Sequence, residues 1–335
     1  MTPVPRPSIL AIVLALFLSV AVSPKHSPAA EEKPSQAYVI EQLANDEQKK
    51  MAQSALNKME AGELAEAEKI LDGMIAKYPD VSLGYHYRSI MRSYQDNLEG
   101  ALSDINRTLY LGPKIIAKYR SRGLIYLQLQ RYAEAAADFR VVLDTLAGGE
   151  DTTVDENARE TEDLLAIALF GDGGQDDEVI RLLQKARKSR NDAGWSYQYA
   201  FQIWTVYARQ GKAHVYVPEL KQAVESEMVR VAANKVEKPA QEWHIMMGRY
   251  LLGQVSEADL MSKASAADSE SEKKSRLQLY YFYMGMKALD AGDKATAQKH
   301  LQASLDNKQG RRNEVFFAQG QLARLKKTPL PAEAR

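Results

Sequence analysis

The feature that most constrains this chain is a pattern of small and large residues that recurs every 34 positions. Three stretches, LAEAEKIL (64–71), LEGALSDI (98–105) and RYAEAAADF (131–139), each place an alanine four residues before a large apolar side chain. The alanines are Ala67, Ala101 and Ala135, so their spacing is constant. A fixed period of this length indicates a repeat architecture, in which one supersecondary unit is stacked several times.

The 34-residue unit resembles the tetratricopeptide repeat, which implies two antiparallel helices joined by a turn in each unit. The unit fits the sequence three times, starting at Gln48, Ser82 and Ile116. Small residues at unit positions 8 and 20 are expected where the two helices approach closely, so that Gly123 would pack at Ala135 in the third unit. Pro79 and Pro113 are expected to end the second helices, because proline in a helix interior removes a hydrogen bond and clashes with the preceding turn.

This arrangement of residues closely resembles the tetratricopeptide repeat. The resemblance implies an all-α solenoid of helix-turn-helix repeats with a capping helix at its C-terminal end. Beyond the three regular units (48–149), a Gly-rich acidic loop is predicted over 146–157, followed by approximate helical repeats over 150–270. The pattern returns in a C-terminal unit starting at Gln278, within 271–326, where FFAQGQLARL (316–325) is expected to close the array. Residues 327–335 are expected to be disordered.

The N-terminal segment has the pattern of a signal peptide. Arg6 precedes an apolar run from Ile9 to Val22, which is too short for a typical membrane span and is followed by small residues and prolines. We expect cleavage near Ala29 or Ala30, which leaves residues 30–47 as a polar segment and a first helix; an uncleaved anchor is the alternative. Cysteine is absent, which excludes disulfides, thiolate metal sites and a lipid-attachment cysteine. The expected location is the periplasm, as a soluble protein.

A second resemblance covers about 85 residues of the C-terminal part. EWHIMMGRYLLGQVSEADLM (242–261) and YYFYMGMKALDAGDKATAQKHLQASL (280–305) are similar to the new lipoprotein I group of bacterial envelope proteins. The resemblance implies an α-helical, often dimeric adaptor that brings cell-wall hydrolases and proteases together. Members of that group are lipid-anchored through a cysteine, whereas this chain has none.

The sequence contains no pattern that favours catalysis or a cofactor. The five histidines lack the spacing of a metal or catalytic site, and GDGGQDDE (171–178) is interpreted as a turn followed by an acidic helix N-terminus rather than a calcium loop. RQGKAH (209–214) and GWSYQ (194–198) lack the residues of a phosphate loop and a nucleophile elbow. Formal net charge is zero, which argues against nucleic acid as a partner.

A binding surface is therefore the expected functional site. In a tetratricopeptide array the first helices line the concave side through unit positions 2, 5, 6, 9 and 12. The candidate peptide-binding residues at such positions are Leu56, His86, Tyr87, Ile90, Arg120, Leu124 and Leu127. Ala52, Leu56, Tyr87, Ala117 and Ser121 stand where a carboxylate clamp would carry its polar residues, so a receptor for chaperone tails is disfavoured. The alternative is that the predicted helix over 37–48, from the same chain or from a dimer partner, fills this groove.

The function predicted from the sequence is that of a non-catalytic scaffold of the bacterial cell envelope. Its expected partners are other envelope proteins or peptides, with a homodimer as a further option, and no integral membrane span is expected after signal cleavage. A component of a secretion or exopolysaccharide assembly system is the second hypothesis. An enzyme with a site in the degenerate middle region is the third.

Overall fold

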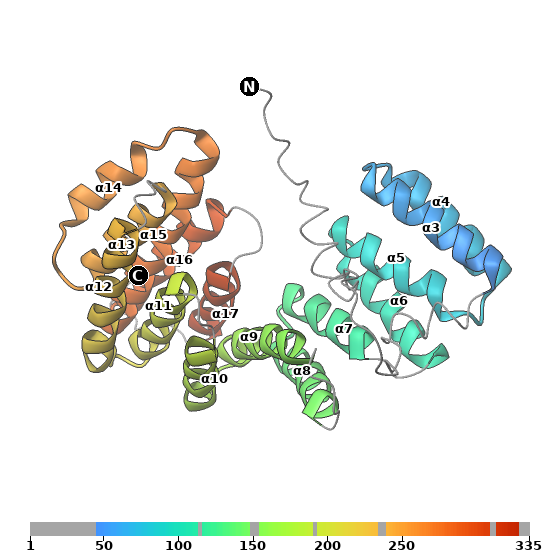
Figure 1. Ribbon diagram of the computed structural model, residues 1–335, viewed down its shortest axis with the longest axis horizontal. Coiled ribbons are helices and arrows are strands. Elements are labelled where there is room, and N and C mark those ends of the chain that lie inside the picture. Colours follow the sequence, from blue (N-terminus) through green and yellow to red (C-terminus); the bar gives the residue numbers. More distant parts are fainter. Residues whose placement is uncertain are drawn as a thin grey trace. The chain divides into compact units, whose positions relative to one another are not determined.

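The computed structural model describes residues 45–112, 116–147, 154–189, 193–233, 239–308 and 313–327. Helices account for almost all of these residues, and no strand occurs among them, which confirms the predicted all-α fold (Figure 1). The predicted signal segment, the helix expected over 37–48 except its last residues, and the predicted tail except Lys327 lie outside the described residues. The chain divides into two compact units, residues 1–161 and 162–335, with the boundary inside one helix.

Unit 1 contains three helical hairpins whose bounds follow the 34-residue repeat. The helices are α3 (Asp46–Glu60), α4 (Leu64–Lys77), α5 (Ser82–Tyr94), α6 (Leu98–Leu111), α7 (Ile116–Gln128) and α8 (Tyr132–Ala147). An asparagine at position 45 begins the first helix with a capping box, in which Asn45 and Gln48 each bond the other's backbone N–H. As predicted, α4 ends before Pro79.

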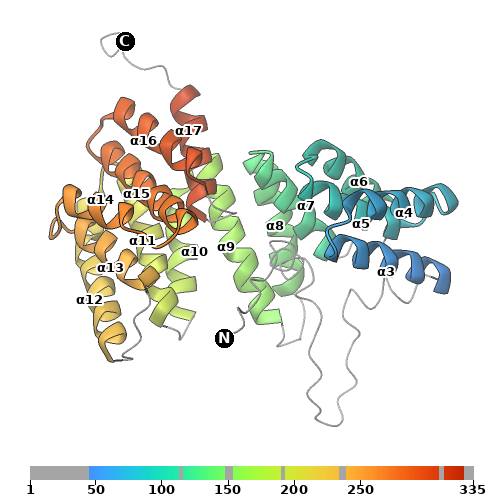
Figure 2. The ribbon, with the colours of Figure 1, turned by 90° about the horizontal axis from the view of Figure 1, so that it is seen from above.

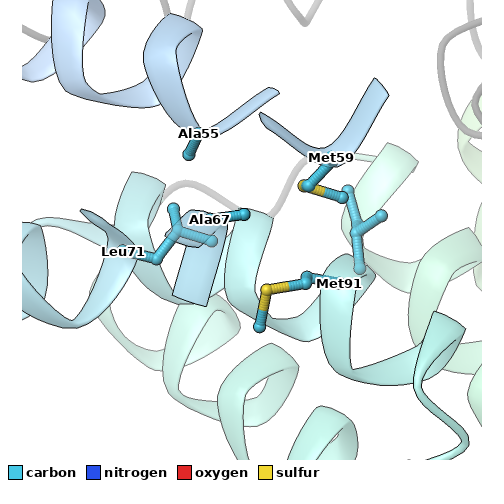
Figure 3. Packing of buried hydrophobic residues seen from close by; sticks show 6 residues of the cluster. Ala55, Met59, Ala67, Leu71 and Met91 are labelled. Atoms are coloured by element: carbon cyan, nitrogen blue, oxygen red, sulfur yellow. The ribbon is translucent and has the colours of Figure 1, made fainter. Parts of the chain in front are cut away.

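The core of each hairpin is a close contact between its two helices. Ala67, Ala101 and Ala135 are fully buried, as the repeat pattern predicts. Figure 3 shows the corresponding side chains of the first hairpin and its neighbour, with Ala55 and Ala67 among Met59, Leu71 and Met91. Small residues at these positions therefore allow the two backbones to approach while the large side chains fill the remaining space.

The contact made by Gly123 differs from the prediction. A Cβ added to Gly123 would lie 2.6 Å from the ring of Phe139, at unit position 24, so the glycine accommodates this ring rather than Ala135. Gly285 in the C-terminal unit repeats the relation, since a Cβ there would lie 2.8 Å from Leu301. The smallest residue of the first helix thus faces the largest apolar residue of the second.

The turn between the two helices requires a left-handed backbone at unit position 15. Gly62 and Gly292 have φ values of 77° and 80° there, a region that glycine adopts without steric cost. The same position holds Asp96 and Gln130 in the second and third units, with φ values of 61° and 57°. The turn geometry is therefore imposed by the hairpin contact even where the sequence offers no glycine.

In the second 34-residue repeat, an arginine of the first helix links three helices of unit 1. Arg88 of α5 donates two hydrogen bonds to the buried carboxylate of Asp104 on α6, at 2.7 and 2.8 Å. It also donates to Asp72 of α4 at 2.6 Å. The same three bonds recur 34 residues later, where the donor and its acceptors are Arg122, Asp138 and Asn106. These bonds join successive hairpins to one another.

Unit 2 contains most of α9 and the helices that follow it. The bounds are α9 (Val154–Asp172), α10 (Asp176–Ser189), α11 (Ala193–Arg209), the 3-10 helix η1 (Ala213–Tyr216), α12 (Val217–Ala233), α13 (Pro239–Leu251), α14 (Glu257–Ser265), α15 (Glu270–Asp290), α16 (Lys294–Asp306) and α17 (Asn313–Lys327). The loop predicted over 146–157 is thus wrong at its C-terminal end, since α9 begins at Val154. The last repeat also starts earlier than Gln278, because α15 begins at Glu270.

The closing helix α17 packs differently from a simple cap over the last hairpin. It contacts α16, and its Phe317 also stacks on Phe170 of α9 with ring centroids 4.3 Å apart. Gly320 lies against Gly171, where a Cβ would be 2.7 Å from the Gly171 Cα. Figures 1 and 2 show α17 beside α9. The last helix of unit 2 therefore packs on the first.

The hairpin contact predicts opposite outcomes for two alanines two residues apart. Ala135→Leu should destabilise the fold by about 1–3 kcal/mol, because Ala135 is fully buried and an added side chain overpacks the contact. Ala133 is exposed on the same helix, so Ala133→Leu should change the melting temperature little. Equal melting temperatures for the two variants would contradict the packing described for α7 and α8.

Candidate functional site

The candidate site comprises the first helices of unit 1, α3, α5 and α7, and the structure separates its predicted residues into two groups. Leu127 is fully buried and Ile90 is 7% exposed, so both belong to the core. Met59 and Ser93, which share unit position 12 with Leu127, are also buried. Unit position 12 is therefore a core position, which corrects the expectation that Leu127 lines a surface.

Arg120 forms an intramolecular ion pair. Its guanidinium lies 2.5 Å from the carboxylate of Glu160 on α9, within unit 1, and the residue is 9% exposed. A buried arginine in such a pair holds two helices together. The expectation that Arg120 gives a groove its specificity is therefore not supported by its position.

Three apolar residues of the predicted set remain half-buried. Leu56 of α3 and Tyr87 of α5 pack on the same core cluster, which contains Ile90, and each keeps part of its surface accessible. Leu124 of α7 is also half-buried, and its carbonyl accepts a hydrogen bond from Gln128, whose amide reaches Ser93 of α5. We call Leu56, Tyr87 and Leu124 the first-helix face. It presents one large apolar side chain from each hairpin of unit 1.

His86 adds a titratable group next to this face. Its ring centroid lies 5.6 Å from that of Tyr87, and its Nδ1 is buried without a hydrogen-bond partner. Burial and, to a smaller extent, the positive charge of Lys118 on α7 together lower the pKa of His86 to about 4. His86 is therefore neutral at pH 7, with a ring nitrogen that has no partner among the described residues.

Lys118 is a buried cation that the sequence analysis missed. The residue is fully buried, and burial lowers the pKa of its ammonium group to about 8. Its Nζ donates one long hydrogen bond, 3.5 Å, to the Thr108 carbonyl near the C-terminal end of α6. The 34-residue pattern gives no hint of this role, because Lys50 and Gly84 stand at the same unit position.

Unit 2 uses its aromatic residues mainly for packing. Tyr283 is 3% exposed and makes edge contacts with Phe201 and Phe282. The acidic start of α10 agrees with the interpretation of GDGGQDDE as a turn and helix N-terminus, and there Asp176 pairs with Arg209. Within the described ranges, no three acidic or histidine side chains converge as metal ligands would. No helix in those ranges is both long enough and apolar enough to cross a membrane.

Comparisons with known proteins bear on the fold. No protein-family model matches the chain, and no curated protein is detectably similar to it in sequence. A tetratricopeptide repeat protein from Parabacteroides merdae ATCC 43184 is similar in structure, with a TM-score of 0.50 and 11% identity, over 83% of this chain and 100% of that one. At this identity the similarity concerns the fold alone. Together with the repeat geometry it identifies the fold as an all-α solenoid of tetratricopeptide type.

Two further solved structures give lower TM-scores. The apo form of the quorum sensor NprR from B. thuringiensis has a TM-score of 0.48 and 12% identity, covering 87% of this chain and 90% of that chain. The C-terminal part of a TPR repeat-containing protein from Cytophaga hutchinsonii has a TM-score of 0.45 and 15% identity, covering 79% of this chain and 98% of that chain.

The burial of His86 predicts a pH dependence of stability. Its pKa is about 4 in the folded protein and about 6.5 in the unfolded chain, so below pH 6.5 the unfolded chain binds a proton that the folded protein does not. The melting temperature should therefore fall between pH 6.5 and pH 4, with a contribution of up to about 3 kcal/mol from this residue.

The matched variant for this measurement is His86→Gln, which cannot titrate. Thermal melts of both proteins at pH 7 and pH 4.5 should show a smaller fall for His86→Gln, since all other groups are common to the two. The same fall in both proteins would contradict the burial of the His86 ring.

Proposed function

We propose that this protein is a non-catalytic scaffold that binds a segment of another protein across the first-helix face of unit 1. The observation that carries the proposal is the placement of Leu56, Tyr87 and Leu124. Core packing in unit 1 buries Met59, Ile90 and Leu127 of the first helices, whereas these three keep accessible surface, one on each successive hairpin. Large apolar and aromatic side chains in such a row are the usual anchors of a peptide-binding surface.

The proposed setting is the bacterial cell envelope. The N-terminal signal pattern over residues 1–29, the absence of cysteine and the resemblance of 242–305 to the new lipoprotein I group support this setting. We propose the periplasm as the location and other envelope proteins, including regulators of cell-wall hydrolysis, as the partner class. A homodimer belongs to the same proposal, because the resemblance implies that such adaptors are often dimeric.

Matched leucine pairs test the binding surface. Leu56→Asn with Leu124→Asn should weaken binding of an envelope partner at least tenfold, because both apolar anchors are replaced by amides. The control pair is Leu109→Asn with Leu143→Asn, whose leucines are equally half-buried and occupy one repeat position on the second helices α6 and α8. Calorimetry with the partner identified by cross-linking in cells, and circular dichroism on the same samples, give affinity and helicity.

The outcome that contradicts the proposal is a loss of binding in the control pair while the Leu56/Leu124 pair binds normally. The competing occupant of the face is the helix predicted over 37–48, from the same chain or from a dimer partner. A chain that begins at Asn45 distinguishes the two, because removal of an internal occupant should strengthen partner binding, whereas the proposal as stated expects unchanged affinity.

A further inference from the structure

The buried ammonium of Lys118 lies where three helices of unit 1 meet. Its Nζ is 3.5 Å from the Thr108 carbonyl, close to the C-terminal end of α6. A Cβ added to Gly112 would lie 2.6 Å from this Nζ and 2.8 Å from the Ser82 hydroxyl at the start of α5. The ammonium of α7 therefore lies between the last turn of α6 and the first turn of α5.

The charges around Lys118 are not balanced within the described residues. Within the part of the chain that the structure describes, the long bond to Thr108 is the only hydrogen bond of Lys118, and no carboxylate pairs with it. Burial of an ammonium group costs several kcal/mol unless a negative group compensates it. A helix C-terminus carries only a partial negative charge, so it offsets this cost in part. Among the described residues, the Lys118 cation thus has no carboxylate as counter-charge.

Two neighbouring groups make the same place more favourable to an anion. The start of α5 has no side-chain cap, since Val81 at the N-cap makes no such bond, and the positive end of the helix dipole lies there. His86, one turn further along α5, has a buried Nδ1 without a partner, and its titration is coupled to the charge of Lys118. We call Lys118, Ser82 and His86 the cationic junction.

We propose that the cationic junction receives the carboxylate of an acidic side chain from the partner segment bound on the first-helix face. A carboxylate can accept hydrogen bonds from the Lys118 ammonium, from the Ser82 hydroxyl and from the single N–H of the neutral His86 ring. This inference rests on the proposed function, because His86 connects the junction to Tyr87 of the face. Leu56 and Leu124 lie on the hairpins either side of α5, so a segment on the face continues past the junction, which favours a side chain over a chain terminus.

The flexible side chain of Lys118 permits this contact. The lysine stem can stay packed while the ammonium turns away from Thr108 toward an incoming carboxylate. Exchange of a long bond to a carbonyl for a charged pair gains more in this buried setting than on an open surface. The partner's carboxylate would therefore supply the negative charge that no described residue provides to Lys118.

Lys118→Met separates this role from a structural one. Methionine keeps most of the stem volume and removes the buried charge, so the melting temperature of the free protein should rise while binding of acidic segments is lost. If Lys118 served only to cap α6, the same variant would lower the melting temperature and leave binding unchanged. Lys50→Met is the matched control, because Lys50 occupies the same repeat position and is exposed.

The test uses a displayed library of random twelve-residue segments, each joined at its C-terminus to a fixed linker. The measured quantity is the residue preference of the segments that bind. The wild type and Lys50→Met should enrich Asp or Glu at one fixed position at least tenfold over Lys118→Met. A second library with a free C-terminus distinguishes an α-carboxylate as the source.

Other enrichment patterns would contradict the inference, the proposed function or both. Equal enrichment by Lys118→Met, enrichment of the free C-terminal library alone, or no acidic preference would overturn the inference. If the selected segments still require Leu56 and Leu124, the proposed function stands and only the inference about the cationic junction fails. Segments that bind the Leu56/Leu124 variant normally, or a failure to select any, would contradict both.

Discussion

The structure depends on a close contact between a small residue of the first helix of a hairpin and a large apolar residue of the second. In the third unit the Phe139 ring occupies the space left by Gly123, and Leu301 does the same at Gly285 in the last. This contact fixes the angle at which the two helices cross, and the turn between them then requires a residue with a left-handed backbone. The Arg88 and Arg122 networks then join neighbouring hairpins through buried carboxylates. The hairpin contact and the arginine network share the 34-residue period because the residues of each occupy fixed positions of the repeat.

Packing also determines which residues remain for binding. In unit 1 the contacts within and between hairpins bury part of every first helix, while other residues of these helices keep accessible surface. Leu56, Tyr87 and Leu124 are such residues in unit 1. Buried polar groups usually have hydrogen-bond partners, but His86 Nδ1 has none among the described residues and the Lys118 ammonium makes one long bond to a carbonyl. An apolar face next to an uncompensated cation favours a partner that combines apolar and acidic side chains.

The repeat period made the hairpins of unit 1 predictable, since small residues at fixed spacing leave few alternatives for helix pairs. Burial within the first helices was less predictable, because Leu127 lies at a position assigned by analogy to a surface, although apolar Met59 at the same position was a usable sign of core. The arginine networks could have been found, since Arg88 and Arg122, like Asp104 and Asp138, obey the period. The packing of Phe317 on Phe170 could not, because that contact joins distant segments outside any repeat. The burial of Lys118 could not be predicted from the sequence either, since it depends on the packing of three helices.

The most direct test of the account is site-specific photo-cross-linking in intact cells. A photoreactive residue at position 56 or 124 lies on the first-helix face, and one at position 133 lies on the exposed side of α8. The account predicts adducts with a second protein from positions 56 and 124 and none from position 133. Adducts from position 133 alone would place the binding surface on the second helices and contradict the central claim.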